Sequence, residues 1–188
     1  EYHRKIYYKT NGDKKVYDTV YNYNADQGNA VATLMYHVGV AVEMNYGTSS
    51  SGAYTTATSL DEPAAVNAYK KYFKYKWTAT SVYIEDYPDA EWKLMMKNEI
   101  DNNRPVQYSG RSETAGHSFV CDGYDVDANF HFNWGWSGSQ NGFFAIGALN
   151  TSSSGAGGNQ ESEYSLDNKA VIGIEPDRST SSTVSITA

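Results

Sequence analysis

The apolar residues of this 188-residue chain change their spacing near Pro105, and this change limits the fold more than any other feature. In three segments before Pro105 they recur every three or four residues, as on one face of a helix, and after Pro105 they alternate with polar residues, as in a strand. Helices are therefore predicted over residues 29–38, 59–72 and 89–102. Strands are predicted for PVQYSG, HSFVCDGY, FHFNWGW, GFFAIG and KAVIGIEP, with glycine-rich turns between them. Helices followed by a run of strands are typical of an α+β domain with an antiparallel sheet.

The segments before the second helix carry their own local signals. Two alternating, tyrosine-rich segments flank Asn11-Gly12-Asp13 and predict a hairpin over residues 5–20, because Asn-Gly favours two-residue turns. Gly39 is predicted to end the first helix. Residues 40–46 then predict a short strand, and residues 47–53 a flexible loop.

Later boundaries are marked as clearly. Ser59 and Glu62 have the spacing of a capping box, with Pro63 in the first turn of the second helix. Residues 82–85 predict a short strand. The glycine-rich residues 152–160 predict a surface flap.

The composition excludes several classes of protein. A net charge of −7 without a basic cluster argues against nucleic acid as a partner, and no apolar run approaches the ~20 residues of a membrane span. The single cysteine excludes an internal disulfide framework and does not fit a zinc ribbon, so we expect neither a metal nor a cofactor. The 17 tyrosines and 16 glycines favour an extracellular, β-rich protein. Without an initiator Met or signal peptide, the chain is expected to be a processed piece of a longer one.

His117 is the candidate catalytic base. It follows Gly116 at the start of a predicted strand, where the backbone allows a substrate to come close. The next strand, residues 130–134, should pair with it and carry Asn133 or Trp134 next to the imidazole. A histidine base in nucleophilic catalysis needs such an orienting partner.

Cys121 does not fit the role of the nucleophile. In an extended strand it lies four residues from His117, so their Cα atoms are about 13 Å apart. It is predicted to be a small buried apolar residue. A metal site built from His117, Cys121, Asp122 and His131 matches no compact ligand spacing. The residues thus indicate a histidine and an orienting group, but no nucleophile.

Five longer blocks of the chain can be compared with known families: GHSFVCDGYD, FHFNWGWSGSQNGFFAIGALN, NAVATLMYHVGVAVEMNYGTSSSGA, NNRPVQYSG and AVIGIEP. Together these blocks resemble the C-terminal half of the streptopain and interpain family of secreted bacterial cysteine proteases. They cover most of residues 29–176 in the order of the family. The resemblance implies a papain-like fold, protein or peptide substrates and a secreted or cell-surface location in a bacterium. Residues 1–176 would be the C-terminal portion of the protease domain, and residues 177–188 a polar tail or linker.

The resemblance also implies roles for individual residues. His117 matches the catalytic histidine, and Asn133 and Trp134 match the motif that orients it. Trp136 would line the substrate cleft or, equally well, pack on the sheet. The segment with Ser49, Ser50 and Ser51 matches a loop that borders the cleft, and residues 152–160 match a flexible loop beside the site.

The family's catalytic cysteine lies on a helix N-terminal to everything here. We therefore expect it on a missing segment or on a second chain, the N-terminal fragment of the same precursor. Without that helix the sheet is expected to expose an apolar face. In the alternative alignment, Ala30 replaces the cysteine. The chain would then be an inactive pseudoprotease or a surface module that binds peptides or glycans.

Overall fold

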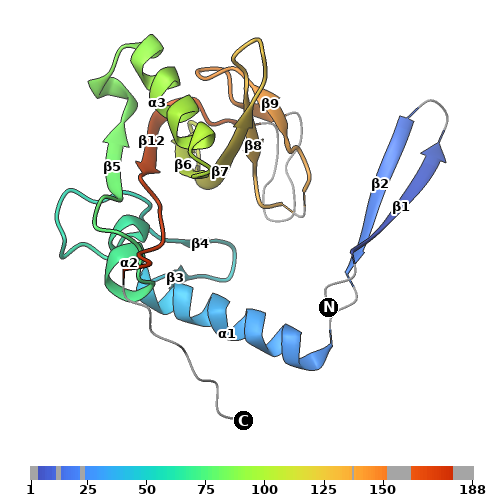
Figure 1. The fold of residues 1–188 in the computed structure, drawn as a ribbon, viewed down its shortest axis with the longest axis horizontal. Coiled ribbons are helices and arrows are strands. Elements are labelled where there is room, and N and C mark those ends of the chain that lie inside the picture. Colours follow the sequence, from blue (N-terminus) through green and yellow to red (C-terminus); the bar gives the residue numbers. More distant parts are fainter. Residues whose placement is uncertain (1–3, 12–13, 22–23, 137, 152–161, 180–188) are drawn as a thin grey trace. The chain divides into compact units, whose positions relative to one another are not determined.

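The computed structural model describes residues 4–11, 14–21, 24–136, 138–151 and 162–179 (Figure 1). The chain divides into two compact units, Glu1–Val40 and Ala41–Ala188, which are described in turn.

The first unit contains the predicted hairpin. Strand β1 (Arg4–Asn11) pairs with β2 (Lys14–Tyr21) in antiparallel register, with Asn11 opposite Lys14. This register confirms the hairpin, although Gly12 and Asp13 of its predicted turn lie outside the described residues.

Helix α1 (Ala25–Ala41) is longer at both ends than the sequence predicts. It begins with a reciprocal capping box: the Gln27 N–H donates to Asn24 Oδ1 at 2.9 Å, and the Asn24 N–H donates to Gln27 Oε1 at 3.0 Å. The prediction that Gly39 ends the helix is wrong. A glycine stops a helix by turning left-handed, and Gly39, which is buried, is not among the residues with positive φ.

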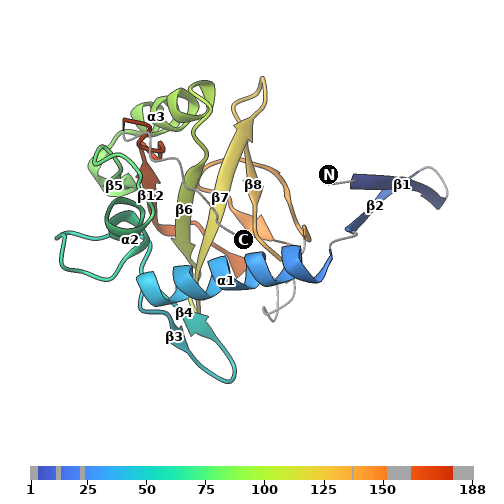
Figure 2. The same ribbon diagram turned by 60° about the horizontal axis from the view of Figure 1, so that its bottom comes forward.

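The second unit is built on a six-stranded antiparallel sheet (Figures 1 and 2). The strand order is β5-β12-β6-β7-β8-β9. The strands are β5 (Thr80–Tyr83), β6 (Val106–Arg111), β7 (Gly116–Tyr124), β8 (Phe130–Asn133), β9 (Gly142–Phe144) and β12 (Leu166–Ile172). All five predicted C-terminal strands are present. The short strand predicted over residues 82–85 is confirmed only in its first half, because β5 ends at Tyr83 and a 3-10 helix follows.

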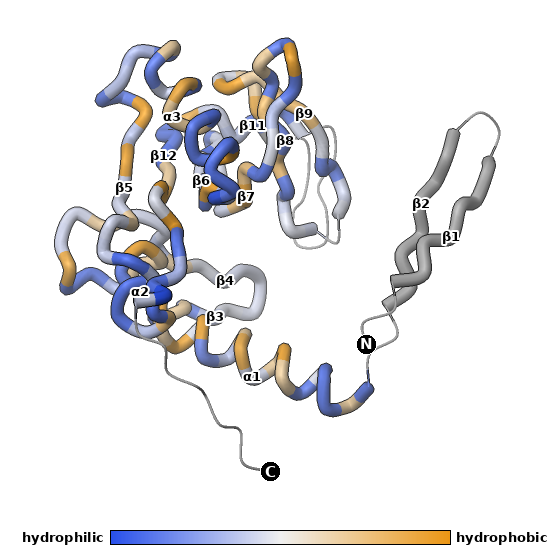
Figure 3. Tube along the Cα trace, viewed as in Figure 1, coloured by the Kyte–Doolittle hydropathy of each residue, from blue (hydrophilic) through white to orange (hydrophobic). Residues whose placement is uncertain are grey.

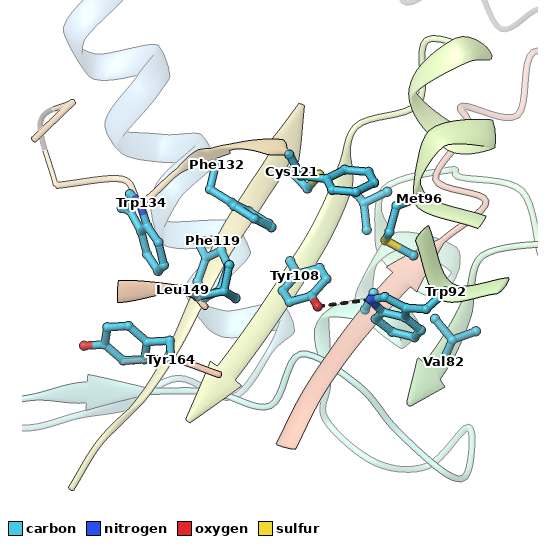
Figure 4. Close-up of a cluster of buried hydrophobic side chains, with 13 residues drawn as sticks. Val82, Trp92, Met96, Tyr108, Phe119, Cys121, Phe132, Trp134, Leu149 and Tyr164 are labelled. Carbon is cyan, nitrogen blue, oxygen red and sulfur yellow. Dashed lines mark hydrogen bonds between the residues drawn. The ribbon is translucent and has the colours of Figure 1, made fainter. Parts of the chain in front are cut away.

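Two helices pack on opposite faces of this sheet. Helix α3 (Asp89–Asp101) follows a short 3-10 helix (Ile84–Asp86) and places Trp92 and Met96 in the main core with Ala170 (Figure 4). Helix α2 (Ala65–Tyr72) packs through Val66 against Val171. Since successive strand residues point to opposite faces, Ala170 and Val171 place the two helices on the two sides of β12.

Helix α2 starts six residues later than predicted, after the proposed capping box. The Glu62 carboxylate does accept from the Ser59 N–H at 2.9 Å, but it closes a separate turn. Ala64 is extended at the helix boundary, with φ −130° and ψ 159°. The first free helical N–H groups donate instead to backbone carbonyls of a distant segment: Ala65 to Tyr54 and Val66 to Thr55.

Two small hairpins complete the second unit. Strand β3 (Asn45–Tyr46) pairs with β4 (Ser51–Gly52), so the predicted strand over residues 40–46 is reduced to its last two residues. The predicted loop 47–53 forms the rest of this hairpin. Strand β10 (Asn150–Thr151) pairs with β11 (Ser162–Glu163). The predicted flap at residues 152–160 and most of the predicted tail lie outside the described residues.

The exposed apolar face expected on the sheet is not found on the core side of the described strands, because the apolar side chains there are covered. On the core side, Tyr108, Phe119 and Phe132 are fully or almost fully buried. On the opposite side, Val120 and Phe143 stay exposed. In the first unit, helix α1 also carries hydrophobic residues along its length (Figure 3). No helix in the described ranges is both long and apolar enough to cross a membrane.

Candidate active site

His117 lies near the start of β7, on the face of the sheet that carries the core. It stands opposite Gly110 of β6. Because strand residues alternate, it shares its face with Phe119 and Cys121, which are both buried. His117 itself is half-buried, at the end of this apolar row.

Two tryptophan rings lie parallel to the imidazole. The ring centroids of His117 and Trp136 are 4.7 Å apart with an interplanar angle of 16°. The ring of Trp134 is almost parallel to His117 at 6.2 Å, and it stacks on Trp136 at 5.5 Å. The register of β7 and β8 explains why these rings meet. Val120 pairs with Asn133 in an antiparallel pair, so the next residues along, Trp134 and Trp136, lie beside Phe119 and His117.

The backbone of Trp134 orients the imidazole. His117 Nε2 lies 2.9 Å from the Trp134 carbonyl oxygen. A carbonyl oxygen only accepts hydrogen bonds, so Nε2 carries the proton of the neutral ring. Nδ1 is then the basic nitrogen, which is the one able to take a proton from a nucleophile.

The surroundings also set the proton affinity of this ring. Burial lowers the pKa of His117 below its ordinary value of 6.5, and the bond to the Trp134 carbonyl acts in the opposite direction. His117 is therefore neutral, and able to act as a base, in the neutral pH range.

Cys121 is buried inside the core, as predicted. It has no exposed surface, and burial raises the pKa of its thiol to about 12. Only a thiolate is a good nucleophile, so Cys121 is structural. The four-residue metal cluster is also not assembled, because Asp122 and His131 pair with each other on the opposite face of the sheet.

Of the other candidate residues, Asn133 is predicted from the sequence to orient His117, and Gly116 and the three serines are predicted to bind substrate. Asn133 does not contact the imidazole; its side chain accepts from the Gly135 N–H at 3.0 Å. Gly116 is exposed directly beside His117. Ser49, Ser50 and Ser51 are exposed in the β3–β4 hairpin. Their role in substrate binding stays a prediction.

Sequence reasoning missed two residues that join this site from far along the chain. Tyr164 packs its ring 5.6 Å from that of His117 and 5.6 Å from that of Trp134. Thr55 hydrogen-bonds through its hydroxyl to Ser118, next to His117, and so ties the segment after β4 to β7. Neither residue lies in a recognisable motif, since only the folded chain brings them here.

The protein-family model described as the Peptidase C10 family matches residues 5–144. This chain belongs to the peptidase C10 family. It is 40% identical over 147 residues to the thiol protease/hemagglutinin PrtT of Porphyromonas gingivalis. It is 35% identical over 147 residues to streptopain of Streptococcus pyogenes. Each match covers 78% of this chain, but only 16% of PrtT and 35% of streptopain.

Solved structures of the same peptidase family share the fold. Active wild-type interpain A of Prevotella intermedia superposes with a TM-score of 0.65 and 28% identity, over 92% of this chain and 74% of that one. A fragment of prointerpain A gives a TM-score of 0.61 and 29% identity, over 82% of this chain and 44% of that one. These findings confirm the papain-like α+β fold and membership of the streptopain and interpain group of cysteine proteases.

Proposed function

We propose that this chain is the histidine-bearing portion of a cysteine endopeptidase. The observation that carries the proposal is the bond from His117 Nε2 to the Trp134 carbonyl oxygen. It presents Nδ1 as a base beside two stacked tryptophans, in a chain whose relatives are thiol proteases.

In the proposed reaction a thiol from outside these 188 residues loses its proton to Nδ1 of His117. The thiolate attacks the carbonyl carbon of the peptide bond, and the imidazolium returns the proton to the leaving amine. Water then hydrolyses the thioester, with His117 again acting as the base. Trp136 covers one face of the imidazole and limits the access of water to the pair.

The nucleophile is assigned to an N-terminal segment of the same precursor, in one chain or as a cleaved fragment. The burial and raised pKa of Cys121 support an external source for the thiol. A secreted or cell-surface site of action in a bacterium fits the bacterial relatives. Substrates would be proteins or peptides.

The test is peptide hydrolysis by the complete precursor that contains this chain. His117→Gln should abolish hydrolysis, because it removes the base, while keeping the fold. Cys121→Ser is the matched control, and it should retain hydrolysis because that thiol is structural. Hydrolysis that survives in His117→Gln would contradict the proposal.

A second candidate is a binding module without chemistry, favoured by the burial of Cys121, the sole thiol of this chain. In that case Ala30 of α1 would stand in the place of the nucleophile. Peptide or glycan binding would then survive His117→Gln, and neither the precursor nor its processed form would hydrolyse peptides.

A further inference from the structure

The backbone of Trp134 is held by two asparagine side chains, one on each of its peptide groups. The Trp134 N–H donates to Asn141 Oδ1 at 3.0 Å. The Gly135 N–H donates to Asn133 Oδ1 at 3.0 Å. Strand β8 ends at Asn133, so side-chain oxygens here take the place of strand partners.

The second of these bonds acts on the same peptide plane that contacts His117. The Trp134 carbonyl and the Gly135 N–H belong to one planar unit. Asn133 Oδ1 binds the N–H end of this unit, and His117 Nε2 binds its carbonyl end. The three groups form one continuous chain of hydrogen bonds through the peptide.

This chain of bonds has two physical effects. Fixing the N–H end fixes the direction of the carbonyl, because the unit is rigid. An acceptor at the N–H also polarises the amide and strengthens its carbonyl as an acceptor. Gly135 has a φ of +84°, so the turn that brings its N–H back to Asn133 is one that glycine adopts without strain.

Asn141 fixes the peptide group between Asn133 and Trp134, from the other side of the turn. It is the residue before β9 (Gly142–Phe144), which pairs with β8. Its position is therefore set by the sheet, and the bond to Trp134 transmits that position to the turn that holds the carbonyl.

We infer that Asn133 and Asn141 are positioning residues for His117, acting through the backbone of Trp134 to hold the imidazole in the form protonated at Nε2. Asn133 thus has an indirect role in place of direct contact, and Asn141 joins the site. The kinetic consequence rests on the proposed function, whereas the structural consequence does not.

The structural test reads the tautomer of His117 by long-range ¹H–¹⁵N NMR of the 188-residue chain, above the pH at which the ring is neutral. His117→Gln identifies the signals. Asn133→Leu and Asn141→Leu remove the acceptor at similar size, and Asn133→Asp and Asn141→Asp keep it. We expect the leucine variants to lose the pure Nε2–H form and the aspartate variants to keep it. Folded leucine variants with an unchanged tautomer would overturn the inference.

Two further measurements complete the design. The aromatic circular dichroism and thermal midpoint of each variant show whether it has folded. If Asn141→Leu does not fold, Asn133→Leu still decides, because the Asn133 side chain is exposed and its hydrogen bond to the Gly135 N–H lies within its own turn.

The kinetic test uses the complete precursor. The leucine variants should lower kcat by up to about a hundredfold, because a misplaced base loses the reactive geometry, and KM should change little. The aspartate variants should restore most of kcat. The two tests can give different answers. If the leucine variants change the tautomer but the wild-type precursor does not hydrolyse peptides, the positioning role stands and the proposed function is contradicted.

Discussion

Trp134 brings two different groups to the site, and the structure separates their roles. Its carbonyl oxygen binds His117 Nε2. Its indole N–H is buried without a hydrogen-bond partner among the described residues. The ring therefore packs in the core, and the backbone orients the histidine.

Trp134→Phe tests this separation. The smaller ring leaves a space in the core, so we expect the free energy of unfolding in urea to fall by roughly 1–2 kcal/mol. The NMR tautomer of His117 should stay Nε2–H, because the carbonyl remains. A change of tautomer in a folded variant would show that the indole is the orienting group.

His117 should also make the stability of the chain depend on pH. Burial lowers its folded pKa below the ordinary 6.5 of the unfolded chain, so the folded state binds fewer protons between the two values. The corresponding stability is present above pH 6.5 and is lost as the pH falls through the folded pKa. His117→Gln should remove this part of the pH dependence of urea unfolding. Identical pH profiles for the two proteins would be the contrary result.

At the scale of elements, the approach of β6 to the segment before β12 is close enough to exclude a side chain. A methyl group on Gly110, the partner of His117 in the sheet, would overlap the Tyr164 carbonyl oxygen and lie 2.7 Å from Asn168 Nδ2. Asn168 accepts a hydrogen bond from the Tyr108 hydroxyl in a buried network. Figure 4 shows the next bond of this network, from Trp92 to Tyr108.

Gly110→Ala should therefore lower the free energy of unfolding by about 1–3 kcal/mol, as overpacking does. Gly52→Ala is the matched control, because a methyl group there meets nothing within 4 Å. Equal thermal midpoints for the two variants would show that the close approach excludes no side chain.

The end of α3 is joined to the end of β12 by a buried carboxylate. Glu99 accepts from Arg104 Nε at 2.8 Å and from the Gly173 N–H at 2.8 Å. The Arg104 side chain, above all its hydrogen bonds, holds the pKa of Glu99 below the ordinary 4.5. The stability from this pair is present above pH 4.5 and is lost as the pH falls through the lowered pKa.

Glu99→Gln should cost about 3 kcal/mol at neutral pH, because it leaves Arg104 without its counter-charge. The exposed pair of Arg111 and Asp167 provides the comparison: its side chains are 51% and 57% exposed, against 21% and 6% for Arg104 and Glu99. Asp167→Asn should leave the urea midpoint unchanged. A similar loss in both variants would refute the buried role of Glu99.

The sequence predicts elements well where the signal is local. The alternation in β6 and β7, the length of α3 and the pairing of β1 with β2 each depend on neighbouring residues. The late start of α2 does not depend on neighbouring residues, because its first N–H groups donate to the backbone carbonyls of Tyr54 and Thr55. Within the site, His117 and Trp134 follow from strand pairing, whereas the contribution of the Trp134 carbonyl and the arrival of Tyr164 appear only in the folded chain.

At the scale of the whole molecule, the proposed function gives the described residues one half of a catalytic pair, His117. Within the unit of residues 1–40, α1 leaves Val31, Leu34 and Met35 exposed by 59%, 55% and 65%. Their spacing of three and four residues places them on one helix face. We expect a further segment to cover this face in the proposed longer precursor. The relatives fit this expectation, because this chain matches only 16% of PrtT and 35% of streptopain.

The source of the nucleophile is best tested by the denaturing intact mass of the native protease after treatment with a thiol-reactive, covalent protease inhibitor. We predict one adduct on an N-terminal segment or chain, none on Cys121, and loss of the adduct in His117→Gln. An unlabelled 20.8 kDa chain as the only species, or an adduct on Cys121, would contradict the assignment of His117 as half of a catalytic pair.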